Sequence, residues 1–163
     1  LVKAWTRKGI DKTYCMRMIE DLPKHIIAKG TVDIRGELYG KGLIPARSQR
    51  LAAGHLRKKQ PSGMGLSFCA FQIFDAKGTE ISNLQQLVKW GFHVCGHIKV
   101  NKDVVNKVKQ LHSQWQDSLI FSRYPTDGIV VKVLDKDLQD KIGRTSIAPS
   151  WATAIKDTWK KTW

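Results

Sequence analysis

The most strongly β-forming part of the sequence reads Gly128-Ile129-Val130-Val131-Lys132-Val133-Leu134, and its β-branched residues predict a strand. Lys132 shares one face of this strand with Val130 and Leu134, whereas the other face is wholly apolar. A lysine in so apolar a strand is seldom buried without a partner. We therefore expect Lys132 to point into a cleft or to meet an anion. The alternative is an edge strand with an ordinary solvated lysine.

A second lysine follows the same pattern near the end of the sequence. Residues 151–156 read Trp-Ala-Thr-Ala-Ile-Lys and predict a final strand, in which Lys156 shares a face with Ala152 and Ala154. A single lysine at a strand end is a weak signal. Two lysines on apolar strands favour phosphate binding, because an ammonium group acts there as a compact point charge.

The elements before these two strands are mixed in type and order. Alternating polarity predicts a half-buried strand over 31–39, and an apolar run predicts a central strand over 66–74. Residues 92–100 alternate more loosely and form a weaker strand candidate. Apolar residues at helical spacing predict three helices, over 45–59 (opening at Pro45), 82–91 (from a Ser82 cap to Gly91) and 101–118. This irregular order favours an α+β fold over a doubly wound sheet.

The charge balance indicates the class of partner. The 163 residues, a length typical of one domain, carry 28 Lys and Arg against 14 Asp and Glu, a formal net charge of +14. This balance favours a polyanion, with nucleic acid ahead of an anionic membrane surface, over a merely solvated basic surface. No apolar run approaches the ~20 residues of a membrane span. The cysteines contain no C-x-x-C pair, which disfavours a zinc ribbon or a disulfide framework and fits a reducing compartment.

Two of the predicted strands carry polar residues that are candidates for a site. Glu37 follows Gly36 in the first strand, and its carboxylate suits ribose hydroxyls. On the strand alone, however, a surface ion pair with Arg35 is favoured. The motif His93-x-Cys95-x-His97 would place three potential metal ligands on one side of a strand, although a partly buried strand without a metal is the favoured interpretation.

Three arginines repeat at helical spacing in the first predicted helix. Arg47, Arg50 and Arg57 would share one helical face with Gly54 between them. Guanidinium groups suit phosphate oxygens, and the glycine would let a phosphate backbone approach the helix. A solvated basic face is the alternative, but the absence of interleaved glutamates favours nucleic acid.

Taken in order, several motifs resemble those of one family. They are Thr6-Arg7-Lys8-Gly9, Ile34-Arg35-Gly36-Glu37-Leu38, Ala52-Ala53-Gly54-His55-Leu56-Arg57, Asp127-Gly128-Ile129-Val130-Val131-Lys132-Val133 and Gly143-Arg144-Thr145-Ser146-Ile147-Ala148-Pro149-Ser150-Trp151-Ala152-Thr153-Ala154-Ile155-Lys156. The set is similar to the successive motifs of the adenylation (nucleotidyltransferase) domain of NAD+-dependent DNA ligases. R-G-E or D-G-x-V-x-K alone would be weak, but the ordered set ending in T-S-x-A-P-x-W-A-x-A-x-K is specific.

The resemblance implies a partial adenylation domain over 1–156 and a C-terminal tail over 157–163. Its fold would be an α+β nucleotidyltransferase fold of antiparallel sheets with flanking helices, with AMP in a cleft between the sheets. The implied reaction seals nicks in duplex DNA: a lysine takes AMP from NAD+, the AMP passes to the 5′-phosphate, and the 3′-hydroxyl displaces it. NAD+ and Mg²⁺ are the implied cofactors and nicked double-stranded DNA the implied partner, in the cytoplasm of a bacterial or phage-infected bacterial cell.

The resemblance also implies roles for single residues. Glu37 would hold the adenosine ribose, while Lys132 and Lys156 would contact the AMP phosphate and stabilise charge during transfer. Asp127 would position a divalent metal or the lysine nucleophile. Arg7 and Arg57 would contact phosphates of AMP or of the nicked DNA. The family has a further arginine at a position where this sequence has Gln49, and either Arg47 or Arg50 could substitute for it.

The sequence departs from the family pattern at several points. It contains no K-x-D-G, the motif of the nucleophilic lysine, which the family places well before Arg7. The family's Asn-Pro-Arg-Asn is replaced by Ser48-Gln49-Arg50-Leu51, the arginine after Pro149 is Ser150, and Trp159 to Trp163 match nothing in the family. These departures suit a divergent, split or phage-type member, in which a preceding segment or a second polypeptide supplies the lysine. The alternatives are an ATP-dependent relative and a non-catalytic ligase-like module that binds DNA or acts as a scaffold.

Overall fold

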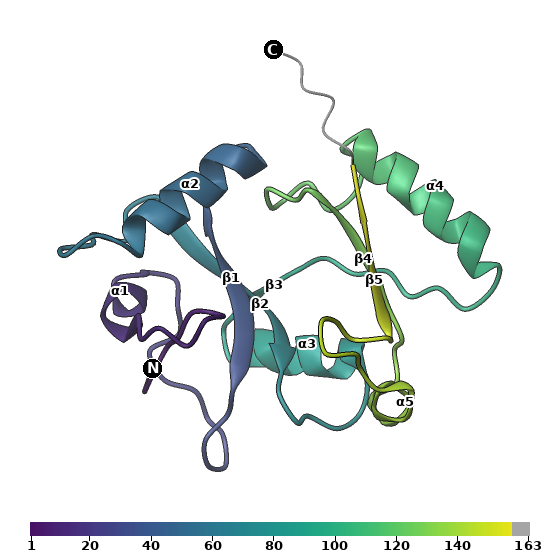
Figure 1. The fold of residues 1–163 in the computed structure, drawn as a ribbon, viewed down its shortest axis with the longest axis horizontal. Coiled ribbons are helices and arrows are strands. Elements are labelled where there is room, and N and C mark those ends of the chain that lie inside the picture. The colour runs from purple at the N-terminus through teal and green to yellow at the C-terminus, as the bar shows by residue number, and fades with distance from the viewer. Residues whose placement is uncertain (158–163) are drawn as a thin grey trace.

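The computed structural model describes residues 1–157, which form two β-sheets and the helices that flank them (Figure 1). The strands are β1 (Ile34–Gly40), β2 (Leu66–Ile73), β3 (His93–Val94), β4 (Gly128–Lys132) and β5 (Ala152–Lys156). The helices are α1 (Thr13–Arg17), α2 (Pro45–His55), α3 (Glu80–Lys89), α4 (Val104–Gln116) and α5 (Lys136–Ile142). The expected α+β class is therefore confirmed, while all but the first residue of the expected tail over 157–163 lies outside the described residues.

The first sheet joins β1, β2 and β3, with β2 in the centre as the apolar run predicts. β1 is antiparallel to β2, and the two-residue β3 is parallel to it, so this sheet is mixed at one edge. Gly36 of β1 lies so close to β2 that a Cβ there would collide with the Phe68 ring and with the carbonyl oxygen of Cys69. The glycine in the first predicted strand thus permits close approach of another strand.

The two faces of the first sheet differ. One face is covered by α1, α2 and α3 and holds the apolar core, in which Leu66 and Ala70 of β2 are almost fully buried. The opposite face carries Tyr39, which contacts Tyr124, and Phe71, which lies near Lys132 of β4. The Tyr39 ring meets that of Tyr124 edge-on, with centroids 5.3 Å apart. The side chains between these two contacts therefore lie on the side that faces the second sheet.

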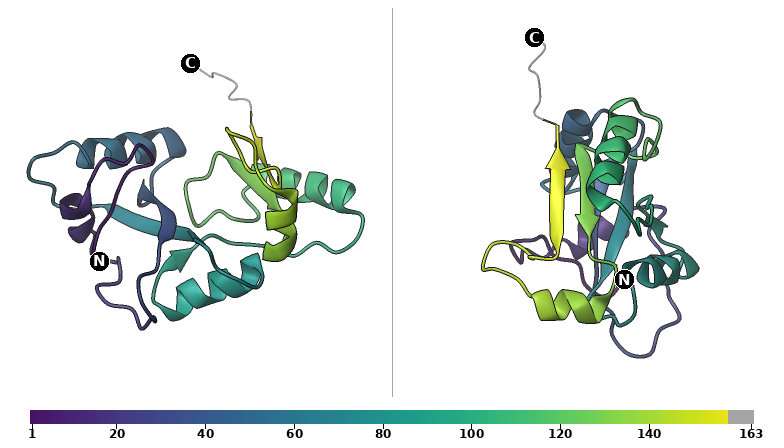
Figure 2. Two further views of the ribbon diagram at one scale, coloured as in Figure 1. Left: turned by 60° about the horizontal axis from the view of Figure 1, so that its bottom comes forward. Right: turned by 90° about the vertical axis from the view of Figure 1, so that its right-hand side faces the viewer.

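The second sheet pairs β4 with β5 antiparallel, with Gly128 opposite Lys156 and Lys132 opposite Ala152. α4 lies alongside this sheet (Figure 2), and both Leu111 of the helix and Ile129 of β4 are buried. Because directly opposite residues of an antiparallel pair share a face, both lysines project from the face that does not carry Ile129. None of the helices in residues 1–157 has both the length and the apolar character that a membrane crossing requires.

Several elements are shorter than their sequence pattern predicts. The helix expected over 45–59 begins at Pro45 as predicted but ends at His55, since no apolar residue continues the helical spacing after Leu56. The strand expected over 92–100 pairs at only two residues, because the chain then leaves the sheet and crosses to α4 (Figure 1). The helix expected over 82–91 begins at Glu80, one turn earlier than predicted, because Thr79 is its cap.

Candidate functional site

Lys132 meets an anion, as its strand predicts. Its Nζ lies 3.6 Å from Oε2 of Glu80, and its side chain is 28% exposed. The same Nζ lies 5.8 Å from the centroid of the Phe71 ring, on the facing side of the first sheet. Although β4 is an edge strand, Lys132 is therefore not an ordinary solvated lysine. Its ammonium group lies between Glu80 of α3 and Phe71 of the first sheet.

Lys156 occupies a different position on the same face. Its Nζ lies 3.0 Å from Oδ2 of Asp127, and both side chains are about half exposed or more. Since Lys132 stands opposite Ala152 and Lys156 is four residues further along β5, the two backbone positions are roughly 13 Å apart along the strands. The structure places the two lysines on one face but at opposite ends of it, each beside a carboxylate.

Glu37 lies on the face of the first sheet that looks toward Lys132. It stands directly opposite Cys69 in the register of β1 and β2, two residues from Tyr39. The ion pair with Arg35 that the strand alone favoured is wrong. The Arg35 guanidinium instead lies over the Phe74 ring, 4.5 Å from its centroid, and Glu37 has no ion-pair partner in residues 1–157.

The two sheets therefore carry Glu37 and Lys132 on the faces that are turned toward each other. Tyr124 lies beside Glu37's neighbour Tyr39, and its buried hydroxyl has no hydrogen-bond partner among the described residues. Burial raises the pKa of Tyr124 to about 12. Nothing in the sequence around Tyr124 singled it out, because its place depends on a contact with β1 that only the fold creates.

The thiols of Cys69 and Cys95 are not nucleophiles. Burial, reinforced by the neighbouring Cys95 and Glu37, raises the pKa of the Cys69 thiol to about 12. Burial also raises the pKa of Cys95 above its ordinary value. Because the thiolate is the reactive form, neither cysteine supplies a nucleophile near neutral pH.

A buried polar cluster, which the sequence did not reveal, lies behind Lys132. Oε1 of Glu80 accepts hydrogen bonds from Lys136 Nζ at 2.6 Å and from Gln139 Nε2 at 2.8 Å. Burial opposes ionisation of Glu80, but these hydrogen bonds and the charge of Lys132 outweigh it and hold its pKa below the usual value. The partners are more than fifty residues apart in the chain, so no local pattern could have linked them.

The basic residues expected at the DNA lie elsewhere. Arg47 and Arg50 are exposed on α2, whereas Arg57 lies in the turn that follows the helix, which corrects the expectation of one continuous helical face. A Cβ on Gly54 would meet nothing within 4 Å, so this surface is open. Arg7 lies exposed at the tip of an N-terminal hairpin, whose base packs on the helix-covered side of the first sheet. Arg7 therefore lies away from the sheet faces that carry Glu37 and Lys132.

Metal ligands are sparse in the described part of the chain. Residues 1–157 contain no group of three or more His, Cys, Asp and Glu residues that could hold an ion. His93 points toward Asp21, with Nδ1 3.6 Å from Oδ2, whereas His97 lines a pocket on α3. The three ligands of His93-x-Cys95-x-His97 therefore diverge, because β3 is too short to hold their alternation. Asp127 remains as a single carboxylate that any metal would share with other ligands.

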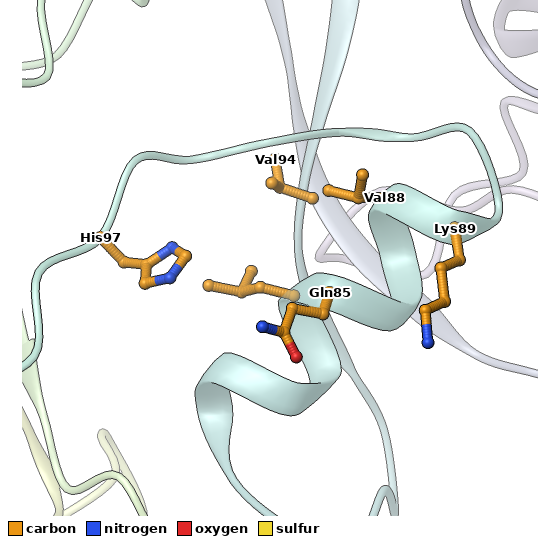
Figure 3. A pocket seen from close by; sticks show the side chains of 6 residues that line it. Gln85, Val88, Lys89, Val94 and His97 are labelled. Atoms are coloured by element: carbon orange, nitrogen blue, oxygen red, sulfur yellow. The ribbon is translucent and has the colours of Figure 1, made fainter.

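A pocket of about 460 Å³ lies between α3 and the segment that holds Val94 and His97 (Figure 3). Its lining includes Val88 and Val94, and His97 and Gln85 stand at its edge. None of the residues expected in the site lines it. This pocket is therefore separate from the residues expected in the site.

Comparison with known proteins identifies the family. Residues 43–159 match the family model for the NAD-dependent DNA ligase adenylation domain. The chain belongs to this family. Arg47, Arg50, Arg57, Asp127, Lys132 and Lys156 all lie within the matched residues of this adenylation domain, while Arg7 and Glu37 precede them.

Relatives of known function are similar over most of this adenylation-domain chain. The DNA ligase of Pelobacter propionicus is 32% identical, over 96% of this chain and 26% of that ligase. The DNA ligase of Anaplasma phagocytophilum is 32% identical, over 91% of this chain and 24% of that ligase, and that of Thermobifida fusca is 30% identical, over 96% and 25%. The chain thus spans about a quarter of the length of the curated relatives it matches.

Proposed function

We propose that this chain is part of an NAD+-dependent DNA ligase that seals nicks in duplex DNA through enzyme–AMP and DNA–adenylate intermediates. The observation that carries the proposal is the family match over 43–159, which includes both lysines of the second sheet. The facing positions of Glu37 and Lys132 support it, because an adenylate needs an acceptor for its ribose hydroxyls and a cation for its phosphate. NAD+ is accordingly the proposed donor of AMP.

Within this function, Lys132 and Lys156 act electrostatically. Each ammonium group would stabilise the charge that develops on the AMP phosphate as it is transferred, one from each end of the open face. Glu37 would hold the ribose from the first sheet. Between the two lysines this face carries Ala152 and Ala154 of β5 beside the exposed Val130 of β4.

Asp127 is the residue of this chain that would hold Mg²⁺. Its carboxylate is a hard oxygen ligand, and Mg²⁺ commonly takes one or two carboxylates together with substrate phosphates. The ion would neutralise phosphate charge during transfer. In the structure this carboxylate pairs with Lys156, whose Nζ lies 3.0 Å from Oδ2. Asp127 would alternatively position the lysine nucleophile.

These 163 residues contain no K-x-D-G motif, the motif in which the family carries its nucleophilic lysine. We infer that a further segment of the same polypeptide or a second polypeptide supplies it. Nicked double-stranded DNA is the proposed partner, and Arg47, Arg50 and Arg57 would contact its phosphates. The net charge of +14 supports that contact.

The test is transfer of labelled adenylate. Native material from the source is incubated with adenylate-labelled NAD+ and, separately, with labelled ATP, and label on protein is measured. Label from NAD+, followed by sealing of nicked DNA, is the expected result. Label from ATP alone would favour an ATP-dependent relative, and no label with nicked DNA still bound would favour a non-catalytic module.

Lys132→Ala in the natural gene product is the sharpest variant. We expect the rate of AMP transfer to fall by about 10²–10³-fold, the cost of losing a group that stabilises transition-state charge. Lys99→Ala, which removes an exposed lysine beyond β3, is the matched control and should leave the rate unchanged. Equal rates for the two variants would contradict the role of Lys132.

A further inference from the structure

The two carboxylate oxygens of Glu80 contact different partners. Oε1 is occupied by Lys136 at 2.6 Å and by Gln139 at 2.8 Å, and both partners are as buried as Glu80 itself. Oε2 is left to face Lys132, whose Nζ lies 3.6 Å away. One oxygen is thus fixed to the fold, and the other is directed at a lysine of the proposed site.

The position of Glu80 does not depend on Lys132. Its backbone N–H donates to the carbonyl oxygen of Leu134 at 2.8 Å, which ties the start of α3 to the end of the β4 region. Thr79 and Ser82 form a capping box that fixes the first turn of α3. Gln139 also donates to the carbonyl oxygen of Val133 at 2.6 Å. The carboxylate is therefore held by the first turn of α3 and by residues of the β4–α5 region, independently of its contact with Lys132.

Lys132, in contrast, has a long and flexible side chain. An unrestrained lysine would have to lose rotamer freedom when it meets a phosphate. The Phe71 ring at 5.8 Å and Glu80 at 3.6 Å restrict it in advance. The cluster combines one carboxylate with the two ammonium groups of Lys132 and Lys136, so one positive charge remains in excess to attract a phosphate.

We propose that Glu80 is a positioning residue for Lys132: its carboxylate, fixed by Lys136 and Gln139, holds the Lys132 ammonium above Phe71, where it meets the adenylate phosphate. This inference rests on the proposed function of Lys132. It differs from a purely structural role, in which Glu80 would only join α3 to α5. The two roles make different predictions, because removal of Lys136 breaks the ion pair that joins α5 to α3, whereas Gln139 still holds Oε1 and leaves Oε2 facing Lys132.

The experiment compares three variants in the natural gene product that carries this chain. Glu80→Gln removes the carboxylate, Lys136→Met removes the buried partner but leaves Oε2 facing Lys132, and the double variant Glu80→Gln/Lys136→Met leaves no unpaired buried charge. For each, we measure the melting temperature, the rate of AMP transfer at saturating NAD+ and the NAD+ concentration at half-saturation. Removing one partner of a buried pair destabilises strongly, whereas removing both is often tolerated.

We expect Glu80→Gln and the double variant to lose between about tenfold and a hundredfold in saturated rate, as a misplaced group typically does, with little change in half-saturation. Lys136→Met should melt at a lower temperature yet keep a rate near wild type. The double variant should recover melting temperature without recovering rate. It also keeps the test decisive if Glu80→Gln alone fails to fold.

The outcomes that overturn the inference are distinct from those that overturn the proposed function. A double variant that recovers both melting temperature and rate would show that Glu80 only joins the two halves. A Glu80→Gln variant with wild-type rate would do the same. Wild-type material that takes no label from NAD+, or a Lys132→Ala variant with wild-type rate, would instead overturn the proposed function and this inference with it.

Discussion

The first sheet and the second sheet are stabilised in different ways. Both apolar core clusters belong to the first sheet, where residues of α2 and α3 pack against β2. The second sheet buries one face beside α4, while Val130 on its other face is 58% exposed. The lysines proposed to bind phosphate stand on that open face. The first sheet thus contains the apolar core, whereas the second sheet carries the two lysines on an exposed face.

Leucine truncation should show this difference most strongly. Leu87 of α3 is fully buried in the second core cluster, so Leu87→Ala should lower the free energy of unfolding by about 2–5 kcal/mol. Val130→Ala, on the open face of β4, is the matched truncation and should change it by less than about 0.5 kcal/mol. Urea unfolding followed by tryptophan fluorescence measures both. Equal losses would mean that the second sheet is as tightly packed as the first.

Local chemistry explains what the sequence could predict about the fold. Pro45 opens α2 because its fixed φ suits a first helical turn, and Gly91, at φ +87, follows the cap of α3 because it alone tolerates that conformation cheaply. The prediction of Ser82 as the cap of α3 is wrong, because Thr79 is the cap and Ser82 is the third residue of the helix. Both side chains take part in the capping box, so the sequence alone does not distinguish them. The short helices α1 and α5 are too brief for a periodic pattern to reveal.

In the candidate site, too, local sequence patterns could not predict contacts between distant segments of the chain. The strand around Lys132 predicted that the lysine meets an anion, because burial of an unpaired charge is costly anywhere. It could not predict which anion, since Glu80 comes from a different part of the chain. Arg35 stacks on Phe74 instead of pairing with Glu37 because the register of β1 and β2 is irregular between Arg35 and Gly36, a feature that no alternation pattern contains.

The glycines of the two functional motifs should respond differently to the same methyl group. Gly36→Ala would drive a Cβ into the Phe68 ring and the backbone of β2, and we expect a loss of about 1–3 kcal/mol in unfolding free energy. Gly54→Ala meets no neighbour and lies inside α2, so it should stabilise by roughly 0.5–1 kcal/mol. Thermal unfolding of both variants compares them directly. A destabilising Gly54→Ala would refute the open surface at α2.

Burial of Cys69 should make the free energy of unfolding fall as the pH rises in alkaline solution. This effect is smaller than those of the substitutions above. The pKa of Cys69 is raised from 9.0 to about 12, chiefly by burial. Below about pH 9 the thiol is protonated in both the folded and the unfolded chain. Between about pH 9 and about pH 12 the unfolded chain loses the proton while the folded chain keeps it, so stability falls as the pH rises.

Cys69→Ala should therefore make the alkaline loss of stability shallower than in the wild type, while leaving the pH dependence between pH 6 and pH 8 unchanged. Denaturant unfolding at half-unit pH steps measures this slope. Because Cys69 lies on the face of β2 that the second half covers, its pKa depends on how closely the two sheets stay together in solution. A wild-type slope identical to that of Cys69→Ala would mean that water reaches this face of β2 in solution.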